Sequence, residues 1–186
     1  MEIGLVIVLA LIVIFSLWVV GLYNGLVRLR NLVQEAWRQI DVELQRRHDL
    51  IPNLVETVKG YAKHEKGTFE EVTRARNMAV APGSSVAEQA QQENMLTQAL
   101  GRLIAVAEAY PDLKANQNFQ QLQQELTNTE DRIAAGRRFY NANVRELNTK
   151  IEVFPSNIVA GLFSFKRAEY FEIEDPAARQ TPSVEF

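Results

Sequence analysis

The sequence of 186 residues contains no cysteine. Disulfide bonds, metal sites built from thiolates and cysteine-dependent catalysis are therefore excluded. Histidine is almost as scarce, because only His48 and His64 are present. Thr68 stands where the second histidine of an H-E-x-x-H zinc motif beginning at His64 would lie. Neither histidine follows a glutamate by three residues, as in di-iron helical bundles, so we expect no metal and no cofactor.

An excess of positive charge is also missing. The chain has 20 Lys and Arg residues against 23 Asp and Glu residues, which gives a formal net charge of -3. Proteins that bind nucleic acid concentrate positive charge on one face, so nucleic acid is not an expected partner. We find no glycine-rich phosphate loop and no alternation of strands and helices, and no Ser-His-acid arrangement can be argued from the sequence. These observations predict a protein that is not an enzyme.

One long apolar run is present at the N-terminal end of the sequence. Residues 3–22 read IGLVIVLALIVIFSLWVVGL and contain no charged side chain. About 20 apolar residues in a helix span the hydrocarbon core of a bilayer. A cleaved signal peptide would need a basic N-terminal region and a small-residue cleavage site, and neither is found around this run. We therefore predict a transmembrane anchor over residues 1–22.

The arginines beside this run predict its orientation. Arg28, Arg30 and Arg38 follow the run, whereas no Lys or Arg precedes it. Positive residues favour the cytoplasmic side of a membrane. We expect a single-pass protein of the cell (inner) membrane of a bacterium, with its N-terminus outside and its larger domain in the cytoplasm.

The remainder of the chain is patterned for helices. Apolar residues recur every three or four positions over 23–80, 86–109 and 116–153, as on the buried face of a packed helix. The last stripe is close to a heptad repeat, which predicts coiled-coil-like packing. Pro52 predicts a kink or a break in the first helix, and Pro82-Gly83 marks a loop at 81–85.

These patterns predict an all-α fold in which an N-terminal transmembrane helix is followed by an elongated, rod-like antiparallel helical bundle. The bundle is expected over residues 23–171. Residues 172–186 contain four acids and two prolines with few apolar residues, a composition typical of a disordered tail.

Polar side chains recur at helical spacings between residues 40 and 65. They are Asp41, Arg46, Arg47, Asp49, Asn53, Lys59 and His64. One interpretation is a solvent-exposed helix face with partners one turn apart. The other is a polar network that fixes the register between helices or between subunits. The sequence leaves both open.

Aromatic residues cluster after the last long helix. The candidates are Phe163, Phe165, Tyr170 and Phe171. They either cap the end of the bundle or form an exposed patch for a partner or for the bilayer surface.

Two long segments carry a family resemblance. Residues 23–65 read YNGLVRLRNLVQEAWRQIDVELQRRHDLIPNLVETVKGYAKHE, and the second half contains YPDLKANQNFQQLQQELTNTEDRIAAGRRFYNANVRELNTKIEVFPSN and FSFKRAEYFE. The chain thereby resembles the LemA family from the anchor to about Glu172. The resemblance implies a single-pass bacterial membrane protein with a helical bundle and no established enzymatic activity. It also implies a link to membrane organisation, because a related magnetosome protein is tied to the formation of a membrane organelle.

Two functional hypotheses follow. The first is a membrane-anchored scaffold that forms homo-oligomers through its helical rod and contacts the lipid bilayer. The second is an adaptor or regulator of a membrane protease or another membrane-associated partner, with the aromatic cluster as its docking element.

Overall fold

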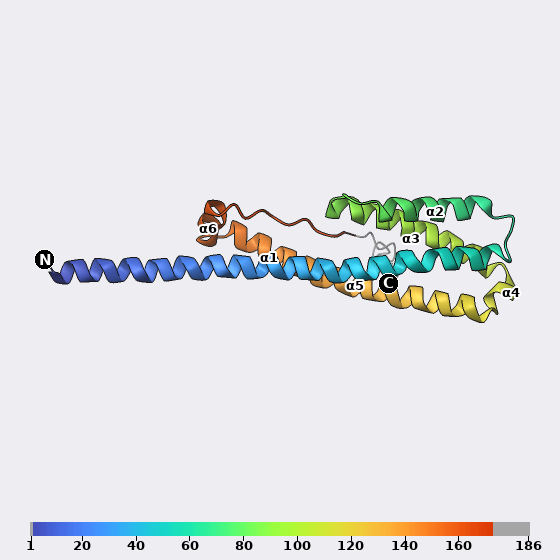
Figure 1. Ribbon diagram of the computed structural model, residues 1–186, viewed down its shortest axis with the longest axis horizontal. Coiled ribbons are helices and arrows are strands. Elements are labelled where there is room, and N and C mark those ends of the chain that lie inside the picture. Colours follow the sequence, from blue (N-terminus) through green and yellow to red (C-terminus); the bar gives the residue numbers. More distant parts are fainter. Residues whose placement is uncertain (1, 173–186) are drawn as a thin grey trace, which may run out of the picture. The chain divides into compact units, whose positions relative to one another are not determined.

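The computed structural model describes residues 2–172, and within that range every regular element is an α-helix (Figure 1). The helices are α1 (Glu2–Lys59), α2 (Lys66–Val80), α3 (Val86–Glu108), α4 (Pro111–Lys114), α5 (Gln117–Glu152) and α6 (Ser156–Leu162). The predicted all-α fold is confirmed, and so is a long apolar helix at the N-terminal end. The predicted tail at 172–186, apart from Glu172, lies outside the described residues.

The chain divides into two compact units, and α1 and α5 contribute to both. The first unit comprises Met1–Arg38 and Arg138–Glu169, and the second comprises Gln39–Arg137 and Tyr170–Phe186.

The N-terminal part of α1 is long enough and apolar enough to cross a membrane. Its most apolar 18-residue window has a mean hydropathy of 3.2, and none of that window is buried inside the protein. A core helix of a soluble protein would bury such side chains. Residues 3–22 therefore form a candidate membrane-spanning segment.

Beyond this segment, the first unit is held together by apolar and amide contacts. Leu26, Leu29, Val33 and Ala36 of α1 are buried, as their spacing predicts. The chain that follows α6 returns beside α5, where Asn148 exchanges two hydrogen bonds with the backbone of Ala168, at 3.0 and 2.9 Å. The Tyr140 hydroxyl donates to a backbone carbonyl, that of Glu169, at 2.8 Å. Burial, with a smaller effect from the Glu169 charge, raises the pKa of Tyr140 to about 12.

The second unit is a helical bundle with a continuous apolar core. Buried side chains come from the C-terminal part of α1, from α2, α3 and α4, and from the N-terminal part of α5. Leu54, Val72 and Leu103 are each almost completely buried. Since α2 packs along α3 (Figure 1), the loop between them must reverse the chain.

That loop, at 81–85, ends where the sequence predicts. Gly83 adopts a φ of 95°, a left-handed conformation that favours glycine. Ser85 then caps α3: its hydroxyl accepts from the Glu88 backbone at 3.2 Å, and the Glu88 carboxylate accepts from the Ser85 backbone at 2.7 Å. This capping box satisfies two donors that the first turn would otherwise leave unpaired.

The first helix ends elsewhere than its apolar pattern indicates. Pro52 lies inside α1, which continues to Lys59, and the chain instead turns at 60–65 before α2 begins. Of the two alternatives for Pro52, a break is therefore wrong, and the apolar stripe over 23–80 is divided between α1 and α2. The apolar spacing runs on across the turn, but Tyr61, which continues that spacing, is 41% exposed, whereas Ala62 is fully buried. Glycine at position 60 weakens the helix at that point.

Pro52 is tolerated because its missing hydrogen bond is replaced from another helix. Proline has no N–H, so the carbonyl of His48, four residues earlier, loses its usual partner within the helix. Arg76 of α2 supplies a donor, because its Nε lies 2.8 Å from that carbonyl oxygen. The proline thus creates an attachment point for α2 on α1.

This attachment predicts an energetic coupling between Pro52 and Arg76. Arg76→Met should lower the free energy of unfolding by about 1–3 kcal/mol, because a partly buried carbonyl is left unpaired. In a Pro52→Ala background the helix supplies its own N–H, so the same change should cost about 1 kcal/mol less. Chemical unfolding of the four proteins in mild detergent, followed by circular dichroism, measures the coupling. Additive effects of the two substitutions would contradict it.

Candidate functional site

The second unit encloses ionisable side chains that have almost no access to solvent. Arg47 and Glu93 are 0% exposed, and His48 is 4% exposed. Charged residues are almost never fully buried unless they are paired. This buried cluster is therefore the first candidate for a functional site.

Arg47 lies at the centre of the cluster and joins three helices. From α1, its Nη1 donates to Glu130 Oε1 of α5 at 2.6 Å and to Thr97 Oγ1 of α3 at 3.2 Å. Its Nη2 forms a buried ion pair with Glu93 Oε2 of α3. The Nε of Arg47 is buried and has no hydrogen-bond partner among residues 2–172. One guanidinium thus holds α1, α3 and α5 at a single position along their lengths.

Glu93 is surrounded by donors on its other oxygen. Its Oε1 lies 2.9 Å from His48 Nε2 and accepts from Gln89 Nε2 at 2.8 Å. Because a carboxylate oxygen only accepts, the His48 hydrogen must be on Nε2. Gln89 also donates to the carbonyl of Ala79 in α2, at 2.9 Å. The cluster therefore reaches α2 as well.

The charges stabilise one another against the cost of burial. Burial is the largest single effect on Glu93 and would raise its pKa, but the hydrogen bond from His48 and the charge of Arg47 together lower that pKa below its ordinary value. Burial would likewise lower the pKa of Arg47, and the charges of Glu130 and Glu93 raise it instead. Both groups are ionised at neutral pH.

The polar residues predicted from the sequence differ in burial. Arg47 alone of the seven is buried; Asp41, Arg46, Asp49, Asn53, Lys59 and His64 lie at the surface. Several have partners on the same helix, as in Arg46 with Glu43 at 3.2 Å and Lys59 with Glu56 at 2.7 Å. The structure does not gather these six into one site.

Sequence reasoning missed His48, Glu93 and Glu130, although a signal for them was present. The buried stripe of α1 passes from Leu44 to Ile51, and Arg47 and His48 fill the inward positions between them. A similar gap occurs in α3, where Glu93 lies between Ala90 and Leu96. In α5 the buried polar position between Leu126 and Ile133 is Thr129, and Glu130 beside it is partly exposed. Each of the three helices thus has a polar residue at a buried position of its apolar stripe, at the turn where it meets the other two.

The predicted aromatic residues have different environments. Phe163 is 51% exposed and Tyr170 is 37% exposed. Phe165 is partly buried, with its ring centroid 5.8 Å from that of Tyr23. Phe171 is 0% exposed, so its side chain is not available at the surface for docking.

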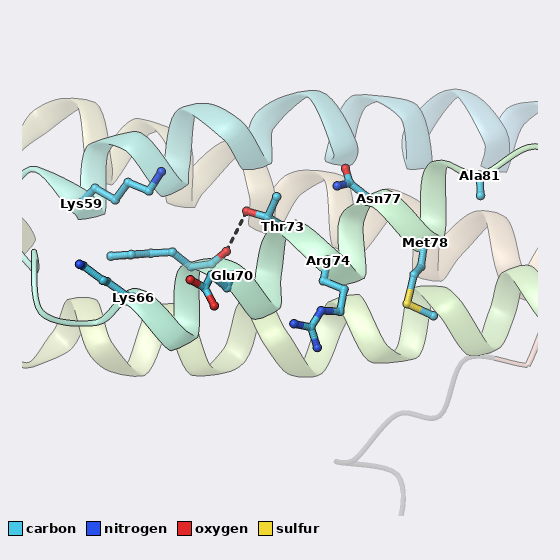
Figure 2. Close-up of a pocket in the computed structure, with 9 residues that line it drawn as sticks. Lys59, Lys66, Glu70, Thr73, Arg74, Asn77, Met78 and Ala81 are labelled. Atoms are coloured by element: carbon cyan, nitrogen blue, oxygen red, sulfur yellow. Dashed lines mark hydrogen bonds between the residues drawn. The ribbon is translucent and has the colours of Figure 1, made fainter.

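A shallow surface groove lies on α2. It has a volume of about 780 Å³, and Figure 2 shows Lys59 of α1 opposite side chains of α2. Three cations, Lys59, Lys66 and Arg74, line it with one acid, Glu70. Phe69 and Met78 add apolar surface. The groove therefore has the charge and surface to receive an acidic, partly apolar segment.

Neither place has the usual features of a catalytic centre. The ionisable atoms of Arg47, His48 and Glu93 are closed to solvent and are already engaged with one another. Within residues 2–172, no group of three His, Asp or Glu side chains is arranged to hold a metal ion. The arrangement is suited to fixing helix positions and to binding at a surface.

Comparison with known sequences identifies the family. The sequence model of the LemA family matches residues 36–186. This chain belongs to the LemA family. The match includes the buried cluster and the groove, whereas the candidate membrane-spanning segment lies before it.

Two relatives of this LemA-family chain show how similar its sequence is to those of other proteins. It is 31% identical to magnetosome protein MamQ 2 of Paramagnetospirillum magneticum, in an alignment covering 87% of this chain and 68% of the relative. It is 28% identical to protein LemA of Metamycoplasma hominis, covering 87% of this chain and 74% of the relative.

The ionised state of Glu93 predicts a dependence of stability on pH. Its folded pKa is lower than its unfolded value of about 4.5, so its contribution is complete above that value and is lost as pH falls through the folded pKa. Between the two pKa values, one such group changes stability by at most about 1.4 kcal/mol per pH unit. Glu93→Gln should be less stable than the parent at pH 7, and it should lose less stability on acidification.

Unfolding measured between neutral pH and pH 3 tests this expectation. Glu56→Gln is the matched control, because the Glu56 side chain is 71% exposed and should leave the parent's pH profile nearly unchanged. An unchanged profile in Glu93→Gln would show that Glu93 is not the group concerned.

Proposed function

We propose that this LemA-family protein is a membrane-anchored, non-enzymatic scaffold that forms homo-oligomers and organises the membrane that holds it. The observation that carries the proposal is the apolar segment at 3–22, whose most apolar window has no buried residue and which continues within the same helix into the buried stripe beginning at Leu26. The anchor and the buried stripe that follows it therefore belong to one continuous helix.

The absence of enzymatic activity is supported by the way the charged groups are used. Arg47, Glu93 and His48 satisfy one another in the interior. A catalytic site would present such groups in a cavity open to substrate. Their burial instead fits a structural role that sets the register between helices. Of the seven polar residues predicted from the sequence, this role applies to Arg47 alone.

Self-association is supported by small residues at the end of the anchor. Gly21 and Gly25 are four residues apart on one helix face, and a Cβ built at either position would meet no atom within 4 Å. This small-xxx-small spacing lets two membrane helices approach closely. The relatives named as magnetosome proteins favour a role in organising membranes.

The arrangement that we propose is a single pass through the cell (inner) membrane. A cytoplasmic helical domain is supported by Arg28, Arg30 and Arg38, which follow the anchor, because positive residues favour the cytoplasmic side. The N-terminus then faces outward. The lipid bilayer and further copies of the chain are the proposed partners.

The groove on α2 supports a second candidate function. An adaptor for a membrane-associated protein needs a docking surface, and the cations around Phe69 and Met78 fit an acidic segment of such a partner. In this alternative the protein acts as a monomer.

The mass of the full-length protein in detergent, measured by light scattering, separates the two functions. The scaffold proposal predicts a defined oligomer that dissociates when Gly21 and Gly25 are both replaced by Leu, because bulky side chains separate the helices. Gly4→Leu is the control, since Gly4 is equally open but lies outside the spaced pair. A chain that is monomeric at micromolar concentration would contradict the scaffold proposal and favour the adaptor.

A further inference from the structure

The short helix α6 and the residues just before it carry unusually exposed apolar side chains. Phe154 is 79% exposed, Ile158 is 62% exposed and Leu162 is 74% exposed. Among the described residues outside the segment 3–22, no other large apolar side chains are as exposed as these three. We call them the α6 apolar face.

This exposure does not arise because α6 is detached. Ala160, on the opposite side of the helix from Ile158, and Val159, between the two sides, are almost completely buried. Ser156 is also buried, and its hydroxyl donates to the carbonyls of Lys150 at 2.6 Å and Val153 at 3.0 Å. Ile158 and Leu162 are four residues apart and share one face of the helix. A fixed helix that presents apolar side chains outward marks a surface covered by something else.

The position of α6 indicates what covers it. Its C-terminal end reaches Phe163, whose ring centroid is 4.7 Å from that of Tyr23, the residue that directly follows the apolar segment 3–22. In Figure 1, α6 accordingly lies beside α1. When the segment spans a bilayer, Tyr23 is at the level of the lipid headgroups. Phe163 and the end of α6 are then at the same level.

Most exposed charges near this end of the first unit are positive, and the acid nearest Phe154, Glu152, is paired with Arg167 at 3.0 Å. Arg28 and Arg30 are exposed on α1, and the Arg30 guanidinium lies 5.3 Å from the centre of the Phe165 ring. Lys166 follows Phe165 and is exposed. Positive side chains beside an apolar face are typical of helices that lie in the surface of a membrane containing anionic lipids.

We propose that the α6 apolar face inserts into the boundary between headgroups and acyl chains of the leaflet where the anchor ends. Arg28, Arg30 and Lys166 then contact anionic headgroups. The inference rests on the proposed membrane anchor and deepens it. The first unit is attached to the bilayer at two places, through the spanning helix and through α6, so its orientation on the membrane surface is fixed.

Because the chain has no cysteine, single cysteines can be introduced and labelled without background. The test uses full-length protein with an environment-sensitive nitrobenzoxadiazole label at Ile158→Cys or Leu162→Cys. The protein is reconstituted into vesicles of phosphatidylcholine and phosphatidylglycerol. Both labels should show blue-shifted emission, several-fold weaker quenching by aqueous iodide than a label in water, and strong quenching by nitroxides on lipid acyl chains.

Two control positions give the label's response in water and in the bilayer. Phe139→Cys is the water control, because Phe139 is 51% exposed in the same unit and lies roughly 20 Å before Phe154 along α5 at 1.5 Å per residue. Val13→Cys reports the anchor itself.

The outcomes separate the two proposals. A Val13 label in the bilayer with iodide-accessible labels at positions 158 and 162 would overturn the α6 inference and leave the anchor intact. A Val13 label in water would overturn the anchor and the inference with it. Labels at 158 and 162 that are shielded from iodide but not quenched by lipid nitroxides would show that protein covers the face, which also overturns the inference.

The contribution of anionic headgroups is tested by changing the charge of the lipid or of the protein. In vesicles of phosphatidylcholine alone, the shielding at 158 and 162 should weaken. In the mixed vesicles, Lys166→Gln should weaken it in the same direction. Equal quenching under all these conditions would overturn the contact with anionic headgroups.

Discussion

The burial of Arg47 between Glu93 and Glu130 constrains the whole of the second unit. A guanidinium removed from water must be met by carboxylates, or its burial costs several kcal/mol. Those carboxylates come from α3 and α5, and His48 and Gln89 complete the shell around Glu93. A slip of any of these helices by one turn would leave a buried charge unpaired. Apolar side chains alone would tolerate such a slip far better.

Stability and specificity are separate consequences of this arrangement. A buried ion pair often contributes no more than well-packed apolar residues of similar size, and the unpaired Nε of Arg47 adds a cost. The benefit lies in selecting one register. This selection matters for a scaffold, because assembly through an outer surface requires that every copy present the same surface. The first unit contributes differently, through apolar side chains that face outward beside the candidate membrane segment.

Local signals in the sequence were sufficient to predict much of the fold. The loop at 81–85 and the stripes of α3 and α5 depend on residues close together in the chain, so the boundaries of both helices were predicted within one residue. Pro52 could not be interpreted in this way. Whether it breaks the helix depends on a donor for the His48 carbonyl, and that donor is Arg76 of another helix.

The candidate site was predicted less well, for a related reason. Arg47 was identified only as one of seven polar residues, because the sequence of α1 alone does not show which of them face acids on other helices. A similar limit applies to Gly136, which interrupts the stripe of α5. A Cβ at that position would lie 3.1 Å from Cγ1 of Ile40, so the gap in the stripe reflects a close approach by α1. Both features depend on pairs of helices.

The most direct test of the central claim, that the buried charges select one helix register, is a distance distribution between α1 and α3. Spin labels at Asn53→Cys and Gln98→Cys, both exposed positions, can be measured by double electron–electron resonance in the otherwise cysteine-free full-length chain. The parent should give one narrow distance. A variant with Arg47→Met, Glu93→Leu and Glu130→Leu should keep its helicity but give a broad or multiple distribution. A single narrow distance, unchanged from that of the parent, would contradict the account.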